Sequence, residues 1–91
     1  MAIAMLLDNP GGSQEIYDQL RKRLDLDRPV GGILHVAGPS PNGGWRVIEL
    51  FDSQEAASRF LKERFAPVYR EVAGSGEPPV PQFWPVHNYL T

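Results

Sequence analysis

The alternation of apolar and polar residues divides the N-terminal part of the chain into a strand, a turn and a helix. Residues 2–8 are an apolar run that ends at the turn-forming segment Asn9-Pro10-Gly11-Gly12. This pattern predicts a first strand buried on both faces. Ser13 is a candidate N-cap for the helix that follows. The apolar stripe of that helix repeats every four residues and consists of Ile16, Leu20 and Leu24, with Tyr17 beside them.

A hairpin and a second helix follow. Residues 30–38 and 45–51 are rich in β-formers, and the loop 38–44 between them is rich in Gly and Pro, which predicts an antiparallel hairpin. Asp52, with Glu55 three residues later, predicts a capping box. Pro67 interrupts the helix that follows, so a kink or two helical pieces meeting near residues 64–66 are expected. Its apolar stripe consists of Ala57, Phe60, Leu61, Phe65, Val68, Tyr69 and Val72.

The last predicted element, residues 80–90, is an edge strand. Pro81 and Pro85 have the same parity, so both missing N–H groups lie on one edge of the strand, while the other edge can still pair. The element order is βαββαβ, the ferredoxin-like split motif, in a single α+β domain spanning residues 1–91. A four-stranded antiparallel sheet with both helices on one face is expected.

The hairpin separates two sets of side chains, because strand residues alternate between faces. The aliphatic set is expected under the helices, and the aromatic and polar set, which includes Phe83, His87 and Tyr89 from the last strand, is expected on the uncovered face. An uncovered face bearing Trp and Phe should not remain in water, so two subunits should pack sheet to sheet. The aliphatic set is Leu34, Val36, Ile48 and Leu50; the hairpin's other set is Ile33, His35, Ala37, Trp45, Val47, Glu49 and Phe51.

Composition limits the function classes. A chain of 91 residues buries only about 60–65% of its unfolded surface, so a second copy would stabilise it. The net charge of −2 gives no reason to expect binding to nucleic acid or an anionic membrane. The absence of cysteine excludes disulfides, thiolate metal sites and cysteine nucleophiles, and fits a reducing compartment. The apolar opening is too short for a signal peptide or a membrane span, which predicts a cytoplasmic protein.

The polar residues of the uncovered face are the candidate site. His35 and Glu49 are expected to lie opposite or diagonal to each other in the hairpin, where a carboxylate could hold the imidazole in one tautomer and suit it as a general base. The alternatives are a structural histidine and a glutamate that reaches solvent. His87 and Tyr89 join them as candidate catalytic residues, or else make dimer contacts. Candidate ligand-binding residues are Trp45, Phe83, Ile33, Val47 and Phe51.

The element order, the apolar open face and the ending Phe83-Trp-Pro-Val-His-Asn-Tyr-Leu90 resemble the dimeric α+β barrel superfamily, especially the small proteins related to antibiotic biosynthesis monooxygenases. This resemblance implies a homodimer. Haem-degrading members carry an axial histidine on the second helix, but residues 53–72 contain none. The quinone-forming oxygenases use Trp, Tyr, Asn and Arg around the cavity. Trp45, Arg46, Asn88 and Tyr89 have those types.

The leading hypothesis is a dimeric α+β barrel that binds a small aromatic or apolar molecule between sheet and helices. It would act as a cofactor-free monooxygenase or isomerase, with no bound metal. His35 would be the base, Glu49 would orient it, and Tyr89 or His87 would stabilise negative charge. The competing hypothesis is a non-catalytic dimer that binds a ligand or partner. A cavity smaller than about 300 Å³ would count against the enzyme.

Overall fold

The elements of the chain follow the predicted order. The computed structural model describes residues 1–24, 29–74 and 78–90. A helical turn of the wider π type joins α2 to α3, so that they form one interrupted helix. The elements are β1 (Ile3–Asn9), α1 (Gln14–Leu24), β2 (Gly32–Pro39), β3 (Trp45–Phe51), α2 (Gln54–Phe60), the π-turn η1 (Leu61–Phe65), α3 (Ala66–Ala73) and β4 (Gln82–Pro85).

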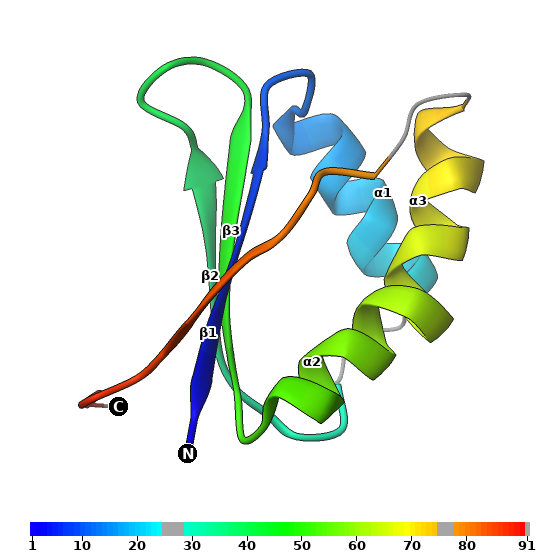
Figure 1. Cartoon of the computed structure of the whole chain (residues 1–91). Coiled ribbons are helices and arrows are strands. Elements are labelled where there is room, and N and C mark those ends of the chain that lie inside the picture. The colour runs from blue at the N-terminus through cyan, green and yellow to red at the C-terminus, as the bar shows by residue number, and fades with distance from the viewer. Residues whose placement is uncertain (25–28, 75–77, 91) are drawn as a thin grey trace.

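The strands form a four-stranded sheet in the order β2-β3-β1-β4, in which every neighbouring pair is antiparallel. The helices lie together on one side of this sheet (Figure 1). This arrangement confirms the ferredoxin-like prediction, and β4 is an edge strand as the prolines indicated. It is, however, shorter than the predicted 80–90. The Val86 N–H still bonds to the Ala2 carbonyl at 2.9 Å, after which the chain continues without strand structure.

The helix starts follow from side-chain capping. Ser13 caps α1 as predicted, because its Oγ accepts a hydrogen bond from the Ile16 N–H at 3.2 Å. The predicted cap of the second helix, Asp52, is wrong by one residue. The Asp52 N–H bonds to the Gly31 carbonyl at 2.8 Å and still belongs to the end of the hairpin. Ser53 caps α2 instead, accepting from the Ala56 N–H at 3.1 Å.

The predicted break in the second helix is confirmed as a π-turn. The Ala66 N–H bonds to the Leu61 carbonyl, five residues back, and the proline at position 67 has no N–H with which to continue the α-helical pattern. Three aromatic rings follow one another along this interrupted helix, each in contact with the next. The ring centroids of Phe60 and Phe65 are 6.4 Å apart, and those of Phe65 and Tyr69 are 5.6 Å apart. These rings form one wall facing the sheet.

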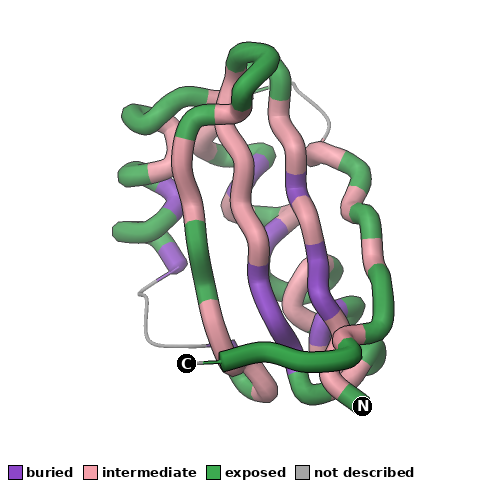
Figure 2. The backbone as a smooth tube through the Cα atoms, turned by 90° about the vertical axis from the view of Figure 1, so that its left-hand side faces the viewer, coloured by how far each residue is buried: buried purple, intermediate pink, exposed green. Residues whose placement is uncertain are grey.

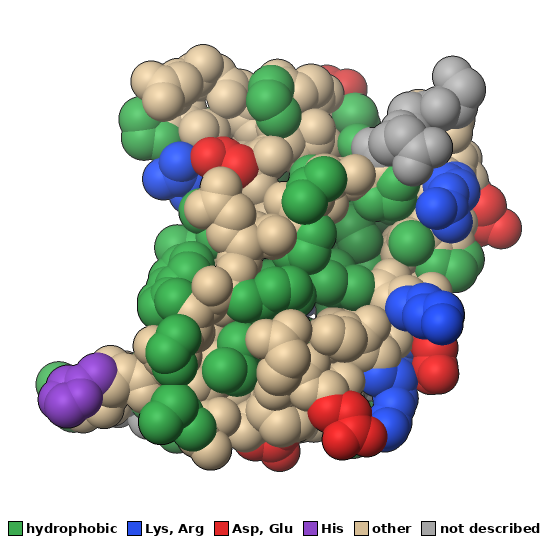
Figure 3. Space-filling model, viewed as in Figure 1, with side chains coloured by type: hydrophobic (Ala, Val, Ile, Leu, Met, Phe, Trp, Pro, Cys, Tyr) green, Lys and Arg blue, Asp and Glu red, His purple; other side chains and the backbone are tan. Residues whose placement is uncertain are grey.

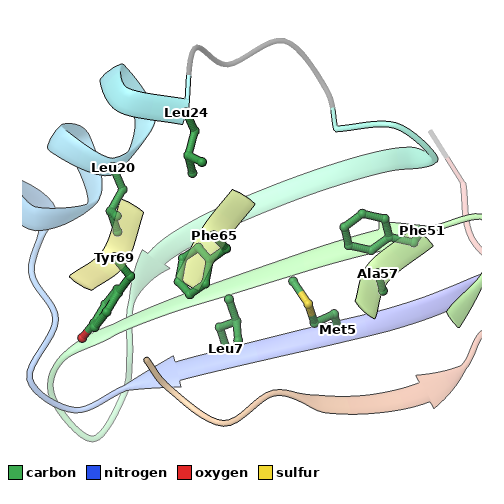
Figure 4. Packing of buried hydrophobic residues seen from close by; sticks show 8 residues of the cluster. All are labelled: Met5, Leu7, Leu20, Leu24, Phe51, Ala57, Phe65 and Tyr69. Carbon is green, nitrogen blue, oxygen red and sulfur yellow. The ribbon is translucent and has the colours of Figure 1, made fainter. Parts of the chain in front are cut away.

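The hydrophobic core lies between the sheet and the helices. Met5 and Leu7 on β1 and Phe51 on β3 point toward side chains of the helices (Figure 4). Phe51 is fully buried, and its ring centroid lies 5.8 Å from that of Phe60. The face of β3 that carries Phe51 is therefore the face covered by the helices.

The predicted assignment of the two faces is consequently wrong. The set containing His35, Trp45, Val47, Glu49 and Phe51 lies under the helices, and the aliphatic set lies on the open face. The ring of Phe51 on β3 packs against that of Phe60 on α2. Val36 on this open face is 51% exposed. The C-terminal segment passes on the open side, near the N-terminus (Figures 1 and 2).

Ile33 does not follow the alternation of its strand. The register between β2 and β3 shifts between Gly32 and Leu34, so Ile33 is the extra residue of a β-bulge. After the bulge, Leu34 pairs with Leu50 and His35 pairs with Glu49. The bulge therefore changes only the pairing at the start of β2, whereas the register that places His35 opposite Glu49 continues unbroken to the hairpin loop.

Across the described ranges 1–24, 29–74 and 78–90, no helix is both long enough and apolar enough to cross a membrane.

Candidate functional site

A cavity of about 230 Å³ lies between the sheet and the helices. Hydrophobic side chains gather in the hollow between these two layers (Figure 3). Its lining is mostly apolar, with a few polar groups, which is the usual form of a small-molecule site. The apolar lining includes Met5, Leu7, Ile16, Leu20, Leu24, Val47, Phe60 and Phe65; the polar lining includes Asn9, Tyr17, Arg21, His35, Trp45, Glu49 and Tyr69.

His35 and Glu49 form a hydrogen-bonded pair in the sheet-side lining of the cavity. The two residues are direct partners in the β2–β3 ladder, and His35 Nδ1 lies 2.7 Å from Glu49 Oε1. The Glu49 side chain is 5% exposed, whereas that of His35 is 32% exposed. A carboxylate is rarely buried without a partner, so the pair satisfies Glu49 and leaves the imidazole within reach of the cavity.

Tyr17 extends this pair into a line of three groups. Its hydroxyl lies 2.6 Å from His35 Nε2, and its ring stacks against the imidazole with the centroids 5.9 Å apart. The Arg21 Nη1 atom, one turn further along α1, donates to the Tyr17 oxygen at 3.4 Å. Glu49, His35 and Tyr17 thus form a continuous hydrogen-bonded path from β3 through β2 to α1.

Trp45 forms an aromatic wall of this cavity, on the helix-covered face of the sheet. Its ring centroid lies 5.5 Å from that of Tyr17. Its indole N–H is buried and has no hydrogen-bond partner among the described residues. Buried donors are nearly always paired, so this N–H is an unused donor beside the cavity.

Two further polar pairs join the elements around the site. Asn9 Nδ2 donates to Tyr69 Oη at 3.0 Å and ties the end of β1 to α3. Arg46 Nη2 lies 2.7 Å from Asp8 Oδ2, on the opposite face of the sheet from Trp45. The hydrogen bond from Arg46 lowers the pKa of Asp8 below its usual value.

The structure brings only part of the predicted site together. His35, Glu49, Trp45 and Val47 line the cavity. Phe51 belongs to the buried core and Phe83 packs against it. Neither of them lines the cavity, and the bulge residue Ile33 is also outside the lining.

The C-terminal candidates lie elsewhere. His87 and Tyr89 follow the short strand β4 and are exposed, as is Asn88. None of the three lines the cavity of this chain, because strand pairing stops before it reaches them. Arg46 is also outside the lining and is paired with Asp8. Of the four residues compared with those of quinone-forming oxygenases (Trp45, Arg46, Asn88 and Tyr89), Trp45 alone lines the cavity.

Sequence reasoning missed Tyr17 and Arg21 as functional groups. The hydrophobic pattern identifies Tyr17 only as a neighbour of the apolar stripe of α1. The available signal was its position one residue after Ile16, which places its ring on the flank of the buried stripe. Arg21 follows four residues later, where one helical turn brings the two side chains into contact.

Within the part of the chain that the structure describes, no three His, Cys, Asp or Glu side chains lie close enough together to hold a metal ion.

Comparisons with known proteins extend the fold assignment. No family model and no curated protein matches the sequence. Among solved structures, a protein of Chloroflexus aurantiacus J-10-fl, provisionally named an antibiotic biosynthesis monooxygenase, superposes with a TM-score of 0.58 and 15% identity over 98% of this chain and 97% of its own. A point mutant of SnoaB, a cofactor-independent oxygenase from Streptomyces nogalater, superposes with a TM-score of 0.57 and 11% identity over 98% of this chain and 93% of its own. The chain thus has the fold of the antibiotic biosynthesis monooxygenase-like proteins.

Proposed function

We propose that the protein is a homodimer that binds a small aromatic or apolar molecule between its sheet and helices. His35 removes a proton from this molecule and Glu49 orients His35. The observation that carries the proposal is the 2.7 Å contact between His35 Nδ1 and the buried Glu49 carboxylate, in the lining of a mostly apolar cavity. A buried carboxylate behind an imidazole is the arrangement that general-base catalysis uses.

The cavity volume limits the size of the ligand. At about 230 Å³, it is larger than the cavity of about 150 Å³ that accommodates benzene. It is smaller than about 300 Å³, the lower end of the range for pockets that bind drug-sized ligands. A cavity below this size was expected to count against the enzyme hypothesis. A ligand with one or two rings is therefore proposed, and a larger polycyclic substrate is disfavoured.

The residues of the cavity supply proton transfer without a cofactor. An ionised Glu49 accepts the hydrogen bond from His35 Nδ1–H, which leaves the Nε2 lone pair as the basic site. In a monooxygenase, dioxygen would be the co-substrate, and a CH₂ group and O₂ would give a carbonyl group and water. In an isomerase, the proton would return to another carbon. The fold shared with a cofactor-independent oxygenase supports the first of these reactions.

The open face of the sheet supports dimerisation. Two of its rows of paired side chains are apolar: Val36 pairs with Ile48 and then Leu6, and Leu34 pairs with Leu50 and then Ala4. Ala4 and Leu50 are already buried within the chain, whereas Val36 is 51% exposed and Trp84, beside Ala4 on β4, is 43% exposed. Exposed apolar side chains of this kind on a sheet face support an interaction surface, and a second copy of the same face would cover them.

A non-catalytic ligand-binding dimer is the second candidate function. The observation that favours it is the cavity volume of about 230 Å³, which is below the roughly 300 Å³ expected for an enzyme pocket that takes a drug-sized ligand. In this alternative, His35 and Glu49 act as a structural pair that satisfies a buried carboxylate.

Binding of 1-naphthol, followed by the fluorescence of the protein's tryptophans, tests the cavity. Val47→Phe fills the cavity from β3 and should weaken binding at least about tenfold, the effect of losing the apolar contacts of one ring. Val80→Phe, at a position 85% exposed and outside the cavity, is the matched control. Equal binding by both variants would contradict the proposed location.

Oxygen uptake with bound 1-naphthol then distinguishes the two functions. Uptake faster than in protein-free solution, lost in His35→Gln, would support the monooxygenase. Exchange of ligand hydrogen with solvent deuterium, without uptake, would support the isomerase. Binding with neither reaction would support the non-catalytic dimer.

A further inference from the structure

Both ring nitrogens of His35 already have partners within the chain. Nδ1 lies 2.7 Å from Glu49 Oε1 and Nε2 lies 2.6 Å from Tyr17 Oη. A ligand in the cavity therefore has no free imidazole nitrogen to approach. If a proton leaves the ligand for His35, it has to pass through the group that occupies Nε2.

The charge state of Glu49 sets the direction of these hydrogen bonds. An ionised carboxylate only accepts, so Nδ1 carries the hydrogen and Nε2 is an acceptor. The Tyr17 hydroxyl then donates its own hydrogen to Nε2. Its oxygen retains lone pairs, and Arg21 Nη1 donates to that oxygen at 3.4 Å. This geometry makes the Tyr17 oxygen an acceptor with a cation beside it.

We infer that Tyr17 is the residue that contacts the ligand and accepts its proton, an inference that rests on the proposed function. The ligand O–H bond breaks as a new O–H bond forms at Tyr17, while the original Tyr17 proton moves to His35 Nε2. The net result is one proton moved from the ligand to His35. The negative charge of Glu49 balances the imidazolium, and the ligand anion accepts a hydrogen bond from Tyr17.

The same contacts specify the chemical class of the ligand. An oxygen acceptor at the end of the path selects a ligand with an acidic O–H, which is a phenol or an enol. The rings of Tyr17 and Trp45, with their centroids 5.5 Å apart, present aromatic surface next to that oxygen. With about 230 Å³ available, the inferred ligand is a phenol or enol with one or two rings.

Among the residues that the structure describes, the ionisable groups around the path are few. The titratable and charged side chains that line the cavity are Tyr17 and Arg21 from α1, His35 from β2, Glu49 from β3 and Tyr69 from α3. The Tyr69 hydroxyl is engaged by Asn9 Nδ2 at 3.0 Å. Tyr17 is therefore the hydroxyl of the cavity that is connected to the buried carboxylate.

The test uses 4-nitrophenol, whose ionised form is coloured, bound to the full chain and titrated with acid and base. In the wild-type protein, the bound probe should ionise more readily than in solution, by about tenfold in its ionisation constant, the effect of one hydrogen bond to a charged group. Tyr17→Phe should abolish this change while naphthalene, which has no hydroxyl, still binds with its wild-type affinity. Tyr89→Phe removes a hydroxyl outside the cavity of the chain and should keep the change.

The results with the wild type and with the two variants distinguish failure of this inference from failure of the proposed function. If neither naphthalene nor 4-nitrophenol binds the wild-type protein, the proposed function fails. If both bind, but Tyr17→Phe ionises the bound phenol as well as the wild type does, the proposed function stands and His35 acts directly, which overturns the role of Tyr17. Loss of the change in Tyr89→Phe would also overturn it.

Discussion

His35 and Glu49 face each other across β2 and β3, with Nδ1 and Oε1 2.7 Å apart. The same register runs without interruption from Pro39 and Trp45 at the hairpin loop to Leu34 and Leu50, and the bulge at Ile33 shifts only the pairing beyond it. Glu49 is 4% exposed, and its carboxylate would be costly to bury without this imidazole.

Removing the charge of Glu49 while keeping the shape of its side chain tests the role of the His35–Glu49 pair. In Glu49→Gln the amide oxygen can still accept from Nδ1–H, so we expect the free energy of unfolding to change by about 1 kcal/mol or less. Glu49→Ala leaves the imidazole unpaired beside a new cavity and should lose about 2–4 kcal/mol. Urea unfolding measures both values.

The glutamine variant should bind naphthalene normally but ionise bound 4-nitrophenol less readily than the wild type, because an amide cannot stabilise the imidazolium. Unfolding of Glu49→Gln as easily as Glu49→Ala would instead indicate that the charge is needed for the fold. The pair would then be structural.

Periodicity predicted the elements and their grouping well, but it could not decide which face of the sheet the helices cover. Alternation places Glu49 and Phe51 on one face and Leu50 on the other. It does not say which of these two faces the helices cover. Packing determines the covered face, because Phe51 contacts Phe60 on α2 with the ring centroids 5.8 Å apart. Contacts of this kind are long-range and leave no periodic signal.

The site could be predicted only where both partners lie in one hairpin. His35 and Glu49 are joined by a short loop, so their pairing follows from local register. Tyr17 comes from a separate helix, and its 2.6 Å contact with His35 depends on how α1 docks on the sheet. The prediction for His87 and Tyr89 depended on a longer β4, but pairing ends at Pro85.

The ion pair between Asp8 and Arg46 predicts a pH-dependent contribution to stability. Arg46 holds the pKa of Asp8 below its usual value, so the folded state favours the ionised carboxylate. The stabilisation is present above the unfolded pKa of about 3.9 and is lost as the pH falls through the lower folded pKa.

Asp8→Asn is the comparison for this pair. The difference in unfolding free energy between wild type and variant should be constant near neutral pH and shrink below about pH 4. It should also decrease with added salt, because the Asp8 side chain is 38% exposed. A difference that does not change with pH would rule out the ion pair as its source.

Two adjacent glycines in the hairpin loop should respond differently to the same substitution. Both have a positive φ, 95° at Gly43 and 85° at Gly44, so alanine is strained at either position by about 1–2 kcal/mol. A Cβ at Gly43 would meet nothing within 4 Å, whereas a Cβ at Gly44 would collide with the backbone of Asn9 and Pro10.

Gly44→Ala should therefore destabilise the protein by about 2–5 kcal/mol, since overpacking against backbone adds about 1–3 kcal/mol to the strain. Gly43→Ala, the matched control, should lose only about 1–2 kcal/mol. Thermal unfolding of the two variants under identical conditions measures the difference. Equal losses would show that the Asn9–Pro10 turn moves aside at little cost.

The proposed sheet-to-sheet dimer predicts which substitution would separate its subunits. Val36 lies in the row Val36–Ile48–Leu6 and is 51% exposed, so in a sheet-to-sheet dimer an aspartate at this position would be buried without a partner. We expect Val36→Asp to weaken dimerisation by at least about 100-fold, corresponding to about 2.7 kcal/mol or more. Val80→Asp, at an exposed position outside the strands, should keep the wild-type association. Sedimentation equilibrium measures both constants, and a Val36→Asp protein that remains as dimeric as the control would show that this face is not the interface.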